Sequence, residues 1–344
     1  MNAVRNGIFA ILLCGVVATA EAQEPKPARP VEPITAILEA FRTHDMVALG
    51  EGAHGNEPGH AFRLSLIRDP RFAAAVNDIV IEFGNARYQD TIDRFVHGEQ
   101  IPDTVLRRVW QDTTQVTPVW DRPIYEEFLR AVRAVNLALP RERRLRVLLG
   151  DPPIDWDDVR TFEDYNRWMA DGNRNRFPAD VIRREVVAKK RRALVIYGEA
   201  HLTRGSAGQS IVGLLEGSAQ VKIFSIASPV SMPMAKPLTT IQADAGTWPV
   251  PSVAILRGTV LGATPITALL PVSGSGGQRT QPVMEDQFDA ILYLGDPSTI
   301  TINRLSAEKC ADGSYMAMRH QRLSLMPPPL AKVQGERLNQ ECAR

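Results

Sequence analysis

The sequence predicts an α/β fold with a mainly parallel central sheet, helices on both faces, and a site at the carboxyl ends of the strands. Short runs of consecutive apolar residues, rich in β-branched side chains, recur along the chain. Such continuous runs are typical of strands that are buried on both faces. Helical stretches separate the first four runs, and strands that alternate with helices form parallel sheets.

The composition is that of a globular protein that can bury a sizeable core. The chain has 344 residues, of which 44% are hydrophobic and 23% are charged, and its formal net charge is +1. Its 40 basic residues are balanced by 39 acidic ones, so the excess of positive charge that nucleic-acid binding requires is missing. We therefore expect no nucleic acid as a partner, and the site residues described below lead us to expect a small-molecule substrate.

The first 22 residues have the pattern of a secretory signal peptide. A weakly basic start precedes an apolar run from Ile8 to Ala20, and small residues suit cleavage after Ala22. The run is shorter than the roughly 20 residues of a membrane span, and the two leucines before Cys14 do not suit a lipidation site. We expect a periplasmic or secreted protein with no membrane contact beyond this segment.

A spacer and then a single domain are expected to follow. Residues 23–33 contain alternating prolines, which favour an extended spacer that does not pack. The single α/β domain is expected over 34–344, starting with a helix at 34–43. The predicted strands are 46–49, 78–82, 145–149, 193–197, 221–226, 252–256 and 288–294. The predicted helices between the first four strands are 61–67, 88–96, 124–139, 162–169 and 179–190.

Two features of the second half of the chain leave alternatives open. Residues 229–286 are rich in Pro, Gly, Ser and Thr, so we expect a loop-rich insertion that is either a lid over a cleft or a surface excursion. Cys310 and Cys342 are the cysteines that remain after signal removal. In an oxidising compartment they form a disulfide or stay as two unpaired thiols.

Acidic and histidine side chains follow four successive predicted strands. Ligands of open α/β sheets bind beyond the carboxyl ends of the strands, so these residues are expected to meet at one edge. Any one of them alone would be an ordinary polar residue at the surface, whereas four strand ends together indicate a site. The residues are Glu51 and His54 after the first strand, Glu82 after the second, Asp151 after the third, and Glu199 and His201 after the fourth.

These side chains suit acid–base chemistry. His54 lies just before a predicted helix, whose positive end disfavours imidazolium, so we expect a neutral ring that acts as a general base. Glu51 or Glu82 would fix its tautomer and stabilise the cation formed on proton uptake. His201 and Arg63 are then candidates to stabilise a developing oxyanion.

The same atoms also permit a metal site. Glu51, His54, Glu82 and His201 could together hold a divalent metal that activates water. No cofactor is expected otherwise. The sequence contains no His-Glu-x-x-His, Gly-x-Ser-x-Gly or P-loop motif, so zinc-motif, serine-hydrolase and nucleotide-binding interpretations have no support. His60 closely follows the first motif, Gly-Glu-Gly-Ala-His-Gly at residues 50–55, and is a further candidate for the same cleft.

Four segments in this order carry a family resemblance. They are "VALGEGAHG", "DIVIEFGNARYQDTIDRFVHG", "RVLLGD" and "ALVIYGEAHL", and the late strand "EDQFDAILYLG" at 285–295 extends the match. The sequence over 46–205 is similar to the erythromycin esterase family. That family is part of a superfamily that also includes Tiki-type metallopeptidases and iron-regulated haem-binding lipoproteins.

The resemblance implies hydrolysis of an ester by histidine-activated water without a covalent enzyme intermediate. It places the water-activating pair on Glu51 and His54, the acid of the second strand on Glu82, and the second histidine on His201, with Arg63 as the helix arginine. Glu199 matches no esterase role, and Glu199 and Asp151 are both expected to support the site. The interval from Glu82 to His201 is shorter than in the esterases, which leaves the substrate open.

Three functions therefore follow from the sequence. The first is a periplasmic or secreted hydrolase that acts on an ester or related carbonyl bond. The second is a metal-dependent peptidase of the Tiki type, and the third is a protein that binds haem or iron without catalysis.

Overall fold

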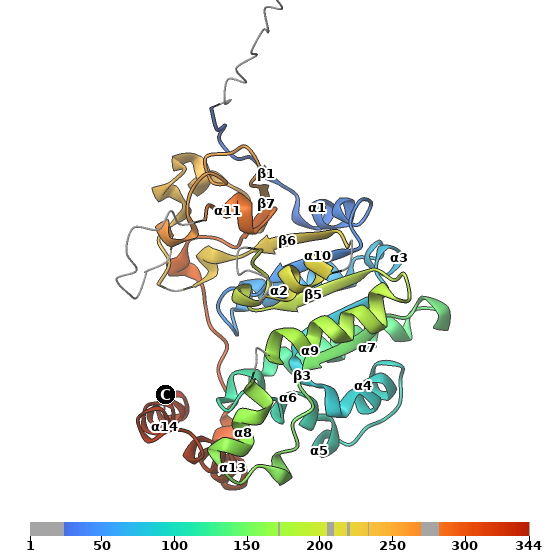
Figure 1. Ribbon diagram of the computed structural model, residues 1–344, viewed down its shortest axis with the longest axis vertical. Helices are drawn as coiled ribbons and strands as arrows, with labels where there is room; N and C mark the ends of the chain where they lie inside the picture. Colours follow the sequence, from blue (N-terminus) through green and yellow to red (C-terminus); the bar gives the residue numbers. More distant parts are fainter. Residues whose placement is uncertain are drawn as a thin grey trace, which may run out of the picture.

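The computed structural model describes residues 24–170, 173–204, 210–218, 221–232, 234–269 and 282–343. The predicted signal peptide and much of the glycine-rich part of the 229–286 region lie outside these residues. One sheet runs through the molecule and helices pack on both of its faces (Figure 1). The predicted α/β class with a mainly parallel sheet is confirmed.

The sheet has eight strands in the order β1-β7-β8-β6-β2-β5-β3-β4. The pairings from β8 through to β4 are parallel, whereas β7 is antiparallel to β8 and the edge strand β1 is antiparallel to β7. The strands are β1 Pro30–Val31, β2 Met46–Gly50, β3 Asp78–Asn85, β4 Arg146–Asp151, β5 Ala193–Tyr197, β6 Ile223–Ala227, β7 Ser252–Ile255 and β8 Ala290–Tyr293.

The register brings the ends of four neighbouring strands together. Ala193 of β5 lies beside Met46 of β2 on one side and Asp78 of β3 on the other, and Asp78 lies beside Arg146 of β4. Parallel strands that start level also end level, so β2, β5, β3 and β4 deliver their carboxyl ends to one edge. The β3–β4 register shifts between Ile81 and Asn85, which is the stretch that contains the acid of the second strand.

Helices connect the strands and cover the sheet. They are α1 Pro33–Ala40, α2 Glu57–Arg68, α3 Phe72–Ala75, α4 Gln89–Val96, α5 Asp103–Leu106, α6 Arg108–Gln111, α7 Pro123–Leu137, α8 Phe162–Met169, α9 Asn173–Ile182, α10 Ile211–Ser218, α11 Met284–Gln287, α12 Ala307–Ala311, α13 Gly313–Ser324 and α14 Pro328–Cys342. Helix α2 begins directly after the first motif because Oδ1 of Asn56 accepts the amide hydrogen of Gly59 at 2.7 Å and caps it.

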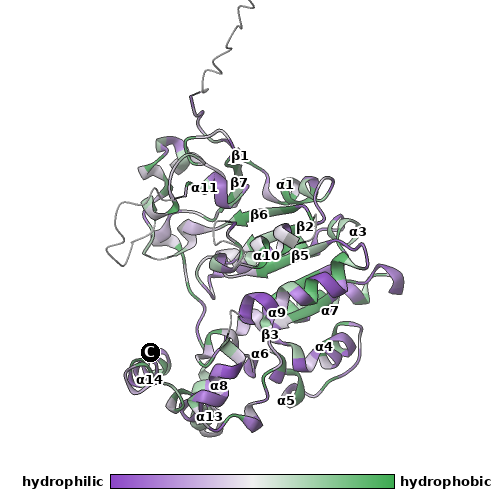
Figure 2. Ribbon diagram, viewed as in Figure 1, coloured by the Kyte–Doolittle hydropathy of each residue, from purple (hydrophilic) through white to green (hydrophobic). Residues whose placement is uncertain are grey.

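Alternate residues of each strand enter different cores. Val47 and Leu49 of β2 belong to the core beneath α2, α4 and α7, whereas Met46 and Ala48 belong to the core beneath α9 and α10. Both faces of the central strands are therefore buried. The central strands appear in hydrophobic colours while the outer helices carry hydrophilic residues (Figure 2).

The N-terminal segment differs from the expected non-packing spacer. Residues Pro30–Val31 form β1 on the edge of the sheet, and Ala28 is buried. The amide side chain of Gln242 accepts from the nitrogen of Ala28 and donates to its oxygen, both at 2.8 Å. The chain is extended, as proline favours, but it packs, because an extended segment can also pair with a sheet edge.

The helix predicted at 179–190 begins earlier and ends differently. Helix α9 starts at Asn173, contains Pro178, and passes into a π-helical turn, Arg183–Val187. This longer helix matters because its first residues reach the carboxyl edge of the sheet.

The C-terminal helices α13 and α14 lie at the lower end of the molecule in Figure 1, with α13 beside α8. Their apolar residues form a third hydrophobic cluster with Trp156 and Tyr165. Cys310 and Cys342 are joined by a disulfide, so of the two alternatives left by the sequence the bonded one is correct. Within the described part of the chain, none of the helices combines the length and apolar character needed to cross a bilayer.

Candidate active site

The carboxyl ends of β2, β5, β3 and β4 carry the predicted residues to one place. Glu51 and His54 follow β2, Glu82 lies in β3, and Asp151 ends β4. Glu199 and His201 lie in the 3-10 turn that directly follows β5. All six strand-end residues are thus found at the same edge of the sheet.

Glu51 and His54 form the first unit of the site. Nδ1 of His54 lies 2.8 Å from Oε2 of Glu51. The other oxygen of this buried carboxylate, Oε1, accepts from Nη2 of Arg63 at 3.2 Å and from the hydroxyl of Tyr125 at 2.9 Å. The ring of Trp120 packs against the imidazole in a T-shaped contact with ring centres 4.5 Å apart. The carboxylate is held on both oxygens, so the direction of the imidazole is fixed.

The electrostatics of this unit correct one expectation. Burial alone would lower the pKa of His54, but the hydrogen bond and charge of Glu51 outweigh it and the pKa lies above its usual value. The predicted effect of the start of α2, which was to disfavour the cation, does not dominate because the Glu51 charge is in direct contact. Burial would raise the pKa of Glu51, yet Arg63 and His54 hold it below its usual value.

Glu82 is the centre of the second unit. Its Oε1 lies 2.5 Å from Nη2 of Arg174 and 3.3 Å from Nε2 of His201, and its Oε2 accepts from the nitrogen of Gly198 at 2.7 Å. Burial opposes ionisation, but His201 and Arg174 outweigh it and bring the pKa of Glu82 to about 2. Nδ1 of His201 lies 2.5 Å from Oδ1 of Asn175. Glu82 is therefore an ionised carboxylate that is paired with the Arg174 guanidinium and contacted by His201.

Gly198 keeps the two units close to each other. A Cβ atom at this position would lie 3.1 Å from Cε1 of His54 and 3.4 Å from Oε2 of Glu82. A larger residue at this position would crowd the space between His54 and Glu82.

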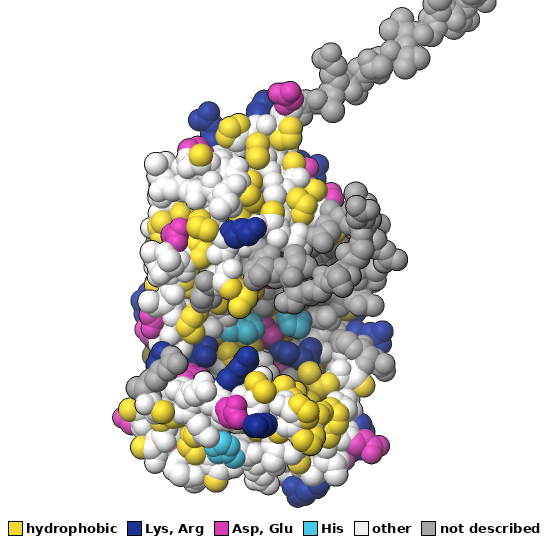
Figure 3. Space-filling view, turned by 90° about the vertical axis from the view of Figure 1, so that its left-hand side faces the viewer, with side chains coloured by type: hydrophobic (Ala, Val, Ile, Leu, Met, Phe, Trp, Pro, Cys, Tyr) yellow, Lys and Arg dark blue, Asp and Glu magenta, His cyan; other side chains and the backbone are white. Residues whose placement is uncertain are grey.

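The site opens to solvent through its histidines and its arginine. The side chains of His54, His201 and Arg174 are 31%, 18% and 22% exposed, whereas Glu51 and Glu82 are at most 3% exposed. The space-filling view shows a hollow in which two histidine side chains flank an acidic one, with Lys and Arg side chains along the rim (Figure 3). Groups that can donate a proton or bear positive charge thus face the hollow, and the carboxylates support them from beneath.

Two further acids are buried at the same edge. Oδ1 and Oδ2 of Asp151 each accept from Thr114 at 2.6 Å, through its hydroxyl and its backbone nitrogen. An oxygen of Glu199 accepts from the backbone nitrogen of Ser228. Burial raises the pKa of both carboxyl groups to about 7 despite these hydrogen bonds.

Two predicted residues have other neighbours than expected. Arg63 pairs with Glu51 beneath the site, so it supports the base and does not reach the hollow. His60 lies on α2 with Nε2 3.0 Å from Oε2 of Glu127 on α7. Its buried ring points to the helix pair, and its hydrogen bond is made outside the cluster.

Sequence reasoning missed Arg174, Asn175 and Tyr125. Arg174 and Asn175 lie in the first turn of α9, and Tyr125 lies in the first turn of α7. These residues belong to no strand-end motif. A buried carboxylate requires a cation or hydrogen-bond donor beside it, but the sequence does not show which residue supplies it.

The same donors do not fit a metal site as they lie. Within the described ranges, no group of three or more His, Cys, Asp and Glu side chains is arranged to hold one ion. Glu51 pairs with His54 and Arg63, and Glu82 pairs with His201 and Arg174. The candidate ligands therefore bind to one another in two separate units, each with an arginine.

The fold is similar to known structures at low sequence identity. A protein described as a succinoglycan biosynthesis protein superposes with a TM-score of 0.58 and 10% identity, covering 81% of this chain and 96% of its own. A mutant of the erythromycin esterase EreC in its open conformation gives a TM-score of 0.51 and 14% identity, covering 79% of this chain and 94% of its own. The erythromycin esterase-like fold suggested by the motifs is thus supported by the structure.

One further structure matches only weakly, and the sequence searches find no match. ChaN of Campylobacter jejuni with cofacially bound haem gives a TM-score of 0.40 at 14% identity, with 60% of this chain and 92% of that chain covered, which is too low to establish a shared fold. No protein-family model matches the sequence. No curated protein matches it either.

Proposed function

We propose that the protein hydrolyses an ester, or a related carbonyl bond, of a small molecule with water activated by His54. The observation that supports this most is the 2.8 Å contact of Nδ1 of His54 with Glu51. With Nδ1–H donated to the carboxylate, the lone pair of Nε2 is on the side of the ring near Gly198, at the solvent-facing hollow. A positioned base in this state is what general base catalysis requires.

Water attacks the carbonyl carbon and gives its proton to Nε2 of His54, while Glu51 stabilises the imidazolium. The carbonyl oxygen becomes an oxyanion, which the Arg174 guanidinium is assigned to stabilise, with His201 as a second donor once its ring turns from Glu82 toward the oxyanion. The bond to the leaving alkoxide then breaks, and that alkoxide takes the proton from His54. No bond to the protein forms at any step.

Glu82 serves this scheme by holding the polarising groups. Its contacts with Nη2 of Arg174 and Nε2 of His201 bring both side chains to the edge of the hollow. Because Glu82 is ionised, it also adds to the negative field that favours the cation on His54. The acid of the second strand is therefore assigned a supporting role and not the role of a base.

The proposal also includes a location and a role for the 229–286 region. The location is periplasmic or secreted, after cleavage near Ala22, and the disulfide suits an oxidising compartment. The role assigned to the region is that of a lid. The region 229–286 begins beside the first motif, since Oγ of Ser231 accepts from the nitrogen of Ala53 at 3.4 Å. A lid that closes the hollow would exclude water other than the attacking molecule.

The test is a hydrolysis screen on the mature protein, with p-nitrophenyl acetate as a general probe, before and after dialysis against EDTA. Hydrolysis that survives dialysis supports the proposal. Hydrolysis lost together with a stoichiometric metal supports the metallopeptidase alternative, and a Soret band on adding haem without any hydrolysis supports the haem-binding alternative. The residues as they lie favour the first outcome, because the candidate ligands form two separate units.

A further inference from the structure

The peptide that carries His54 is held by a side chain from another part of the chain. Nη1 of Arg122 donates to the carbonyl oxygen of His54 at 3.0 Å. Arg122 also packs on Gly55, whose φ is +82°, and a Cβ atom there would lie 2.5 Å from Nη1. The guanidinium therefore lies directly against the backbone of the base, in a place that only a glycine leaves open.

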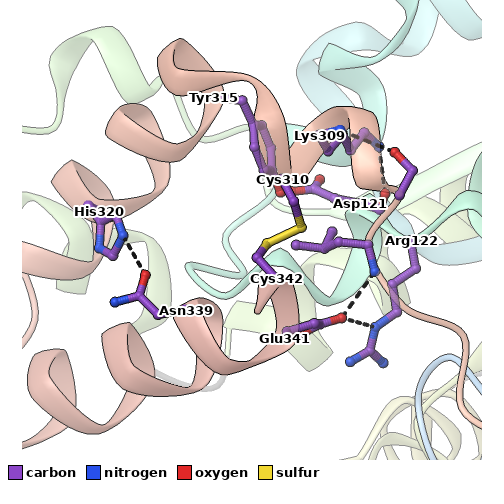
Figure 4. The surroundings of a disulfide bond; sticks show 11 residues. Asp121, Arg122, Lys309, Cys310, Tyr315, His320, Asn339, Glu341 and Cys342 are labelled. Carbon is purple, nitrogen blue, oxygen red and sulfur yellow. Dashed lines mark hydrogen bonds and ion pairs between the residues drawn. A yellow bond between two sulfur atoms is a disulfide. The ribbon is translucent and has the colours of Figure 1, made fainter. Parts of the chain in front are cut away.

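Glu341 holds Arg122 from the other side. Nε of Arg122 lies 3.3 Å from Oε1 of Glu341, and the same oxygen accepts from the nitrogen of Leu305 at 3.2 Å (Figure 4). The two charged side chains are only 16% and 19% exposed. Such a pair is less screened than one at the open surface.

The disulfide fixes the end of the helix that carries Glu341. Glu341 is the next-to-last residue of α14, and the last one, Cys342, is bonded to Cys310 of α12 (Figure 4). Helix ends fray readily when nothing holds them. With the disulfide in place, the last turn of α14 stays beside Arg122.

We propose that Arg122 is a positioning residue for His54, and that Glu341 and the disulfide between Cys310 and Cys342 keep it in place. The inference deepens the proposed function, on which its kinetic part rests. Arg122 touches the backbone of the base and not the reacting atoms, so it acts through His54. A base displaced by about 1 Å can lose roughly a hundredfold in rate.

The kinetic test compares two arginines of one surface cavity, which Arg122 and Arg337 both line. In Arg122→Gln we expect kcat to fall roughly 10- to 100-fold with KM unchanged. Arg122→Lys keeps the charge beside Glu341 and should recover part of the loss. Arg337→Gln also removes one positive charge from this cavity, but from a residue of α14 that does not contact the His54 backbone, and it should behave as wild type. An unchanged kcat in Arg122→Gln overturns the proposal.

The second measurement needs no substrate. Hydrogen–deuterium exchange of a peptide spanning residues 50–58 is expected to quicken in Arg122→Gln and Glu341→Gln, and in the double variant of Cys310→Ser with Cys342→Ser, but not in Arg337→Gln. If the wild-type protein hydrolyses no ester, the proposed function fails while faster exchange still supports the positioning. Unchanged exchange in Arg122→Gln and Glu341→Gln overturns the positioning, even if the cysteine variant does not fold.

Discussion

Oε2 of Glu51 lies 2.8 Å from Nδ1 of His54, and this contact sets the direction in which the imidazole can accept a proton. The carboxylate cannot turn away, because its other oxygen is hydrogen bonded by Arg63 and Tyr125. The base of the proposed reaction is thus positioned by a buried carboxylate that has two further partners, Arg63 and Tyr125.

The first prediction concerns the pH dependence of hydrolysis. The reaction needs neutral His54, and Glu51 raises the pKa of that ring. Activity should therefore be low at acidic pH and rise through a midpoint above the usual histidine value of about 6.5. Glu51→Gln removes the negative charge, so the midpoint should move to lower pH while kcat falls. The measurement is kcat/KM from pH 5 to 9 for both proteins, and equal midpoints would contradict the role of Glu51.

The second prediction concerns stability and Glu199. Burial raises the pKa of this carboxyl group to about 7 in the folded protein, above its value in the unfolded chain. The folded state therefore holds the proton more tightly, and its stabilising effect is lost as pH rises through about 7. Each unit of such a shift corresponds to about 1.4 kcal/mol.

The matched variant for this test is Glu199→Gln, which keeps the shape of the side chain and stays neutral. Urea unfolding at pH 5 and pH 8 should show a smaller loss of stability with rising pH in Glu199→Gln than in wild type. Asp151 has the same direction of shift, so the wild-type slope should not vanish entirely. Identical slopes in both proteins would show that Glu199 does not titrate in this range.

The third prediction concerns the buried ion pair under the base. Arg63→Met leaves the Glu51 carboxylate without its cation, and breaking one side of a buried pair costs about 3–5 kcal/mol. Tyr125→Phe removes one hydrogen bond to the same oxygen and should cost less, roughly 1.5–3 kcal/mol. Free energies of unfolding from urea titrations test the order. A Tyr125 variant less stable than the Arg63 variant would contradict the arrangement.

The fourth prediction concerns Arg174, which the sequence did not indicate. Arg174→Gln removes a positive charge from the hollow and weakens the hold on Glu82, so kcat should fall by roughly 10²–10³-fold. Arg183→Gln, on the turn that follows the same helix, is the control outside the site. The measurement is kcat and KM from steady-state kinetics. A higher KM with unchanged kcat would contradict the prediction and make Arg174 a binding residue only.

The sequence was informative where local pattern determines structure. Continuous apolar runs ending in Gly-Glu predicted both β2 and β5, and parallel pairing then required Glu51 and Glu199 to share an edge. The sequence was not informative where partners come from distant segments. Arg174 meets Glu82 only because α9 begins before its predicted start, and no local signal marks that start.

Other differences have similar causes. Alternating prolines favour extended backbone, and that preference alone does not distinguish a free spacer from an edge strand such as β1. The charge state of His54 depends on the balance between the start of α2 and the carboxylate of Glu51, and the balance is set by a contact distance that the sequence does not contain. His60 follows the motif closely, yet the direction of its side chain on α2 takes it to Glu127.

The most direct test of the account is kcat/KM for a hydrolysed ester in His54→Ala, measured beside wild type and His44→Ala after dialysis against EDTA. His44 lies outside the site, beside Phe224, so its variant reports the background from ordinary histidines. The account predicts that kcat/KM falls at least a hundredfold in His54→Ala, which is the lower end of the range for removing a general base. His54→Ala and wild type should be equally folded by circular dichroism. Retained activity in folded His54→Ala would contradict the claim that this histidine activates the water.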